Sequence, residues 1–150
     1  MKKIHLALIS VALLLPGTLT AQPRRDERRE ARHEQVGTTI RDCERRTDEF
    51  KVELKRYLDR SRIDGTPRER ELNRDAQALE REMNVVREAW DRERDIPRVK
   101  RHAKKAIDAA MGLNRTMDRH RISGELQHTW QAVRRDLNRL ANVFDLPNLR

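Results

Sequence analysis

The amino-acid sequence predicts an all-α protein, an antiparallel up-down-up-down four-helix bundle with an N-terminal arm. Apolar residues recur in steps of three and four along four segments, the spacing that gives a helix one apolar face. No segment shows the period-two alternation of a half-buried strand. Charged residues make up 39% of the 150 residues and aromatic residues 3%, so this periodicity alone separates the chain from a disordered polyampholyte.

The first segment has the features of a secretory signal. Two lysines precede an almost uninterrupted apolar run over residues 4–15, which leads to the small residue Ala21. The run is shorter than the roughly 20 residues that span a bilayer, which disfavours the alternative of a retained membrane helix. We therefore expect residues 1–21 to be removed by cleavage near Ala21-Gln22, leaving a protein in the periplasm or outside the cell.

A charged arm and the first bundle helix follow. Residues 22–37 are rich in arginine and acidic residues and show no clear apolar stripe, so they form either a solvated helical extension or a flexible arm. We expect the first bundle helix over residues 38–60. Its apolar stripe, which starts at the end of the arm, consists of Val36, Ile40, Cys43, Thr47, Phe50, Leu54 and Tyr57.

The second helix is expected over residues 66–94. Thr66 is its N-cap, Pro67 takes the first helical position and Glu69 the third, which together make a capping box with its favoured proline. Its stripe consists of Leu72, Ala76, Leu79, Met83, Val86 and Trp90.

Two further helices complete the bundle. The third is expected over residues 96–120 behind the N-cap Asp95, and the fourth over 123–144 behind the N-cap Ser123. The stripe of the third consists of Val99, Ala103, Ala106, Ala110, Leu113 and Met117. The stripe of the fourth consists of Leu126, Trp130, Val133, Leu137, Leu140 and Phe144.

Short connections between these helices make sequential neighbours antiparallel, so the bundle spans residues 38–146 and leaves 147–150 as a C-terminal tail. Trp90 and Trp130 both occupy stripe positions. This placement favours a core role for both rings over the stacking of a ligand.

Cys43 is the one cysteine of the chain, which excludes an internal disulfide and a multi-cysteine metal site. Its stripe position favours a small buried side chain. The alternative is an intermolecular disulfide, and hence a dimer, in an oxidising compartment.

Motifs for catalysis and metal binding are absent from the sequence. The histidines beyond the signal are His33, His102, His120 and His128, and no two of them have the i, i+4 spacing that places two ligands on one helix face. The sequence has no glycine-rich phosphate loop. We therefore expect no catalytic residue, no metal site, no cofactor and no small-molecule substrate.

The positive charge is concentrated in one helix. The chain carries 34 basic and 25 acidic residues, a net charge of +9, and residues 96–121 hold eight basic residues against two acidic ones. Five basic residues near the start of this helix form a candidate anion-binding site: Arg98, Lys100, Arg101, Lys104 and Lys105. Cations at a helix N-terminus oppose the helix dipole, so something should offset this cluster.

Two explanations of the cluster remain open. The preceding helix ends in acidic residues, namely Glu88, Asp91, Glu93 and Asp95, which an antiparallel hairpin places beside the basic cluster. The two misplaced clusters then neutralise each other. The alternative is that the surplus charge faces solvent and meets an anionic partner.

The C-terminal part carries a family resemblance. Its residues are Ser123, Trp130, Val133-Arg134, Asp136-Leu137-Asn138 and Leu140-Ala141, joined by the loop from Asp59 to Thr66. This block resembles small exported helical proteins of soil bacteria, notably acidobacteria, which have no known activity. The resemblance implies a helical fold and export, and names no partner.

Together these observations predict a non-catalytic exported or periplasmic bundle with a structural or interaction role in the cell envelope. Its partners are anionic envelope components or other proteins. The alternative is an anion-binding module that uses the basic cluster to hold nucleic acid, lipopolysaccharide or phospholipid headgroups.

Overall fold

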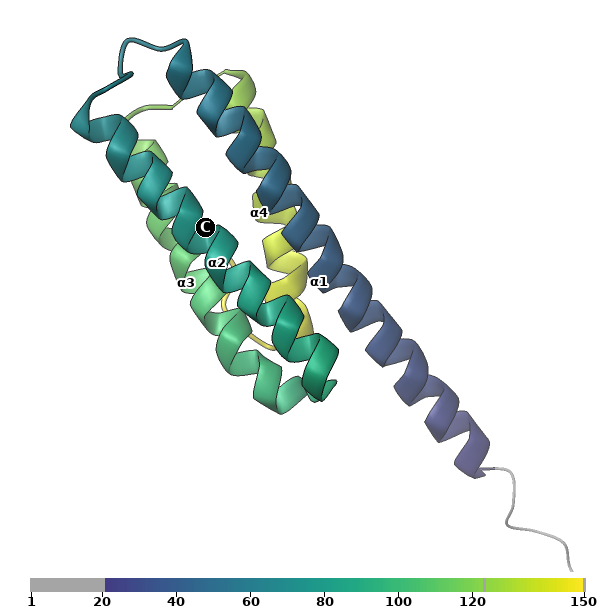
Figure 1. The fold of residues 1–150 in the computed structure, drawn as a ribbon. Coiled ribbons are helices and arrows are strands. Elements are labelled where there is room, and N and C mark those ends of the chain that lie inside the picture. Colours follow the sequence, from purple (N-terminus) through teal and green to yellow (C-terminus); the bar gives the residue numbers. More distant parts are fainter. Residues whose placement is uncertain (1–20, 123, 150) are drawn as a thin grey trace, which may run out of the picture.

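The computed structural model describes residues 21–122 and 124–149, and this part of the chain contains helices and no strand (Figure 1). The helices are α1 (Ala21–Asp59), α2 (Pro67–Glu93), α3 (Ile96–Arg119) and α4 (Glu125–Val143). They run alternately up and down, with α1 packed against both α2 and α4, and α3 packed mainly against α2. The predicted all-α four-helix bundle is confirmed. The predicted signal, apart from Ala21, lies outside the described residues.

The N-termini of α2 and α3 are capped as the sequence predicts. The Thr66 hydroxyl accepts a hydrogen bond from the Glu69 backbone N–H at 3.4 Å, and Asp95 Oδ1 accepts one from the Arg98 N–H at 3.0 Å. The Glu69 carboxylate accepts from the backbone N–H of Gly65 at 2.6 Å, one residue before the N-cap. This satisfies one more donor of the turn that leads into α2.

Other helix ends depart from the expected chemistry. The predicted cap Ser123 lies outside the described residues, and α4 begins behind Gly124, which has φ +76° and no side chain to donate or accept. Three non-glycine residues just past the ends of helices adopt the left-handed conformation: Arg94, Arg121 and Asp145, with φ of 45°, 52° and 50°. Glycine is the usual residue at such a position. Because these three residues are not glycine, the sequence does not mark these helix ends.

The arm is helical and continuous with the first bundle helix. At 1.5 Å per residue, the 39 residues of α1 extend about 58 Å, whereas the 27 residues of α2 extend about 40 Å. The excess projects beyond the end of the bundle where α2 joins α3 (Figure 1). Residues 24–32 are exposed, and packing begins at His33 and Val36. Of the two forms that the sequence allowed, the arm has the solvated helical one.

The core follows the predicted stripes. Every stripe residue is buried except Tyr57, which is half-buried because Leu58 takes the inward position beside it. Trp130 is fully buried, its ring 5.1 Å from that of Phe50, and its Nε1–H donates to Asn114 Oδ1 at 2.8 Å. The indole therefore joins α4 to both α1 and α3.

One carboxylate is also buried. Asp136 is 6% exposed and accepts hydrogen bonds from Arg46 of α1 at 3.3 Å and from Arg139 at 2.6 Å. It lies on the α1-facing flank of the α4 stripe, where the apolar pattern gives no sign of it. The predicted tail also packs onto the bundle, since Leu149 is 4% exposed and its backbone N–H donates to Asn138 Oδ1 at 2.7 Å.

Candidate functional site

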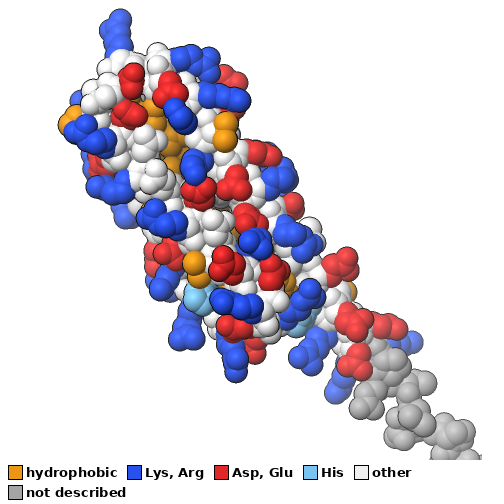
Figure 2. Space-filling view, in the orientation of Figure 1, with side chains coloured by type: hydrophobic (Ala, Val, Ile, Leu, Met, Phe, Trp, Pro, Cys, Tyr) orange, Lys and Arg blue, Asp and Glu red, His pale blue; other side chains and the backbone are white. Residues whose placement is uncertain are grey.

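The basic cluster, Arg98, Lys100, Arg101, Lys104 and Lys105, occupies the first turns of α3, at the end of the bundle from which α1 projects. With 3.6 residues per turn, Arg98, Arg101 and Lys105 fall within a sector of about 60°. All are exposed except Lys100, which is half-buried, while the stripe residues of the same turns are buried. Lys and Arg side chains protrude from this end of the bundle in Figure 2.

Ion pairs leave most of this cluster free. Lys104 Nζ lies 2.7 Å from the exposed carboxylate of Asp108. Among residues whose side chains are described, no carboxylate lies within 4 Å of the other four basic groups. At the end of α2, Asp91 pairs with Arg87 at 2.9 Å and Asp95 caps α3 through a backbone N–H. The direct ion pairs expected between the two helix ends are therefore not formed in the described structure.

Charges along the seams between helices are, by contrast, often paired. Lys51 of α1 lies 2.6 Å from Glu80 of α2. Glu71 of α2 accepts from Arg119 at 2.5 Å and lies 2.8 Å from His120 Nε2. The hydrogen bond from His120, assisted by the positive charge of Arg119, lowers the pKa of the Glu71 carboxyl below its ordinary value. The seam charges thus have partners, whereas in the basic cluster only Lys104 has a described carboxylate within 4 Å.

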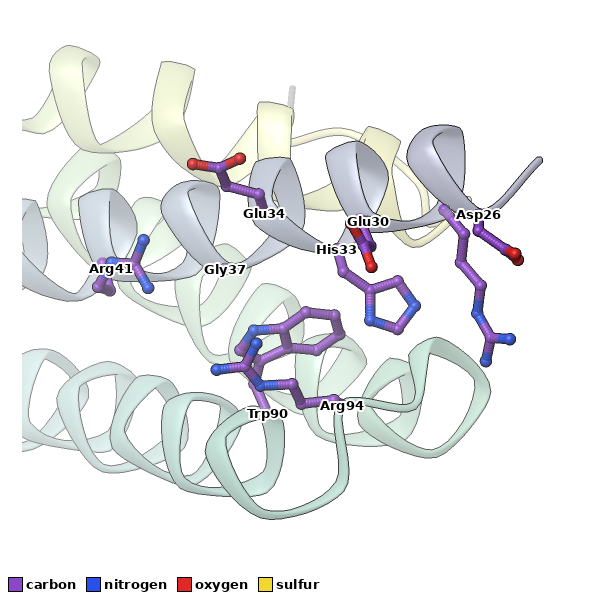
Figure 3. Close-up of a pocket in the computed structure, with 9 residues that line it drawn as sticks. Asp26, Glu30, His33, Glu34, Gly37, Arg41, Trp90 and Arg94 are labelled. Carbon is purple, nitrogen blue, oxygen red and sulfur yellow. The ribbon is translucent and has the colours of Figure 1, made fainter. Parts of the chain in front are cut away.

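A second feature is an open cleft of about 690 Å³ between the projecting part of α1 and the end of α2 (Figure 3). We call it the arm cleft; it is lined by Asp26, Arg29, Glu30, His33, Glu34, Gly37, Arg41, Trp90 and Arg94. The His33 ring lies 5.5 Å from that of Trp90, tilted by 48°. Trp90 is 3% exposed, so its predicted core position is confirmed, but one edge of its indole borders the cleft.

The arm cleft is not evident in the sequence. Its residues come from a segment without an apolar stripe and from the last turn of another helix. The one available signal is Gly37, because glycine inside a helix costs about 1 kcal/mol relative to alanine and so calls for a packing or functional reason.

The remaining candidate residues stay apart from these two features. Cys43 is 1% exposed, so an intermolecular disulfide would require α1 to separate from the bundle. Its burial, with a contribution from the negative charge of Asp136, raises the pKa of the thiol. Within residues 21–122 and 124–149, no three His, Cys, Asp or Glu residues are placed to hold a metal ion. None of the helices in this part of the chain is both long and apolar enough to cross a membrane.

Comparison with known proteins adds no identity: no family model, curated protein or solved structure matches this chain. The resemblance to exported helical proteins of soil bacteria stays a prediction. Function is therefore argued from the chain's own residues, the basic cluster above all.

Proposed function

We propose that this chain is a non-catalytic, exported helical-bundle protein of the cell envelope that acts by binding, and that its basic cluster holds an anionic partner. The supporting observation is that Arg98, Lys100, Arg101 and Lys105 have no carboxylate within 4 Å among the described residues. Four unpaired cations at a helix N-terminus repel one another and oppose the helix dipole. An anionic partner would remove both costs.

The arrangement favours contact with several negative groups at once. Residues 98–105 extend about 10 Å along the helix, and the cationic side chains fan outward over its solvent-facing half. A surface or chain that carries repeated phosphate, sulfate or carboxylate groups therefore suits the cluster better than a single ion. Binding of this kind weakens steeply with salt, because the Debye length falls from about 10 Å at 0.1 M to about 3 Å at 1 M.

The surroundings of the cluster limit what it does with that partner. No Phe, Tyr or Trp lies between the basic residues, and the one ring among them, that of His102, is half-buried. The cluster therefore lacks the exposed rings on which nucleic-acid bases stack. The apolar residues of the same turns, Val99, Ala103 and Ala106, are buried in the bundle and are not free to enter a lipid layer. We therefore propose contact with charged headgroups or backbones, whether of lipopolysaccharide, phospholipid or nucleic acid.

The test reverses three charges, Lys100→Glu, Lys104→Glu and Lys105→Glu, in one variant. At about 1 kcal/mol for each basic residue near an anionic surface, we expect the affinity for heparin and for vesicles rich in anionic lipid to fall by roughly 100-fold or more. The matched control reverses three exposed arginines outside the cluster, Arg62, Arg68 and Arg135, and changes the net charge equally.

An equal loss of affinity in both variants would show that binding depends on net charge alone, and would overturn the assignment of the site to the basic cluster. If the cluster is instead a structural match for the acidic end of α2, the cluster variant would melt at a lower temperature and bind as the parent does. Comparison of heparin, vesicles and DNA then identifies which source of negative charge binds best.

A further inference from the structure

We infer that the arm cleft is a second binding site, for a single carboxylate or phosphate group held by Trp90, Arg41 and Arg94 above Gly37. This site shares the end of the bundle with the basic cluster but uses none of its residues, so it does not depend on the proposed function. The inference rests on the close approach that a glycine permits, on donors without acceptors and on the charges around them.

Gly37 lets the indole of Trp90 pack directly against the backbone of α1. A β-carbon at this position would lie 2.9 Å from Trp90 Nε1 and 3.4 Å from Arg41 Nη1. The absence of a side chain therefore lets an indole N–H from α2 and a guanidinium from α1 approach the same point. Glycine is unfavourable inside a helix, and this close approach is the physical reason for it here.

The donors around this point lack acceptors. Trp90 Nε1–H donates to no described group, and the one side-chain hydrogen bond of Arg41 goes to the Thr38 hydroxyl at 3.2 Å. Neither Arg41 nor Arg94 has a described carboxylate within 4 Å. In Figure 3 the Arg94 guanidinium lies beside the indole, and Arg41 approaches from the other side of Gly37. Two guanidinium groups and one indole N–H that face the same cleft can donate hydrogen bonds to the oxygens of a carboxylate or phosphate.

Negative charges at the outer part of the cleft restrict the ligand. Asp26, Glu30 and Glu34 line the cleft on the α1 side and outnumber the Arg29 guanidinium, which lines the same part; Asp26 and Glu30 lie toward the arm in Figure 3. These carboxylates repel an extended polyanion but tolerate a compact group that places one oxyanion at Gly37. The arm cleft therefore selects a different ligand from the basic cluster, namely a small molecule or chain end with one oxyanion.

The two tryptophans provide a direct test by NMR. In ¹⁵N-labelled protein, titration with inorganic phosphate at constant ionic strength should shift the indole N–H signal of Trp90 until it saturates. The Trp130 signal is an internal control, because its N–H already donates to Asn114 in the core. A Trp90 signal that does not shift, or that shifts without saturating while Trp130 shifts equally, would overturn the inference.

Variants locate the binding groups. Arg41→Gln and Arg94→Gln should each weaken phosphate binding by about tenfold, the effect of losing one charge-assisted hydrogen bond. Both residues are exposed, so folding should be unaffected. Arg32→Gln, at an exposed residue of α1 that does not line the cleft, is the charge-matched control. Equal weakening in the control would contradict a defined site.

Two further experiments identify the chemical class of the ligand and separate the arm cleft from the basic cluster. Saturation by both acetate and phosphate assigns a general oxyanion site, and saturation by phosphate alone assigns a phosphate site. The triple lysine reversal in the basic cluster should leave phosphate binding within about twofold of the parent. Loss of phosphate binding in that variant would show that the cluster binds it, and would overturn a separate site in the cleft.

Discussion

Replacement of Trp130 by alanine is the most direct test of how the four helices are held together. The indole is fully buried, contacts Phe50 of α1 and hydrogen-bonds Asn114 of α3. Truncation of a buried tryptophan costs about 3–5 kcal/mol of the free energy of unfolding. We expect a value in the upper part of this range, because the cavity would lie among three helices and no single neighbour could fill it.

This loss is large for one small domain, whose total stability is about 5–15 kcal/mol. It corresponds to a fall in melting temperature of roughly 10–20 °C for a chain of this length. Trp130→Phe separates the two contributions of the indole, since it retains most of the ring contact and removes the donor to Asn114. We expect this variant to lose about 1–2 kcal/mol.

Urea and thermal unfolding followed by circular dichroism at 222 nm measure these differences. Asn114→Ala, alone and combined with Trp130→Phe, completes a double-mutant cycle with an expected coupling of about 1 kcal/mol. An unchanged melting temperature for Trp130→Ala would refute the placement of this indole at the centre of the bundle. A coupling of zero would refute the hydrogen bond and leave the packing intact.

Three other predictions concern the side chains of Asp136, Glu71 and Cys43. Asp136→Ala should lower the free energy of unfolding, measured in urea, by about 1–3 kcal/mol, because it removes the acceptor for Arg46 and Arg139. Arg139→Ala, at a largely exposed side chain, should cost less than about 1 kcal/mol. The pKa of Glu71 is lower in the folded state than in the unfolded state. The stability that its charge contributes is therefore present above the unfolded pKa of about 4.3 and is lost as the pH falls through the folded pKa. Glu71→Gln should lower the melting temperature at pH 7, and the difference from the parent should vanish in acid. Cys43 should resist iodoacetamide at pH 8 in the native protein and react fully in urea, because burial raises the pKa of its thiol and excludes the reagent. Rapid alkylation of the native protein would contradict the burial of Cys43.

The helices and core were predictable because apolar periodicity and capping chemistry are local properties. The hydroxyl of Thr66 and the carboxylate of Asp95 act within three residues, so the sequence placed the starts of α2 and α3 correctly. Errors arose where a neighbouring helix decides the outcome. Leu58 rather than Tyr57 points inward, and Asp136 is buried because Arg46 comes from another helix to pair with it. Neither fact has a signature in its own segment.

The candidate sites differ in the same way. The basic cluster is contiguous in sequence, so its position on one exposed helix face follows from helical geometry. The sequence left open whether the acidic end of α2 neutralises the charge of this cluster, because ion pairs between two helix ends depend on how the helices pack. The arm cleft joins Gly37 and Trp90, residues more than fifty positions apart, through the packing of α1 against α2. A glycine inside a helix is a weak signal for it, since Gly112 of α3 carries the same signal and has no such contact.

Both candidate sites carry a local cost to folding. At Gly37 the cost is backbone flexibility within α1, and at the basic cluster it is repulsion between cations at the start of α3. Sequences usually remove such conflicts where only folding is at stake, as the capped starts of α2 and α3 and the paired charges of Glu71 and Glu80 show. These two costs lie at the same end of the bundle, where α1 projects and α2 joins α3 (Figure 1). Conflicts that persist together at one end are typical of binding surfaces, because a partner supplies there the contacts that the chain itself lacks.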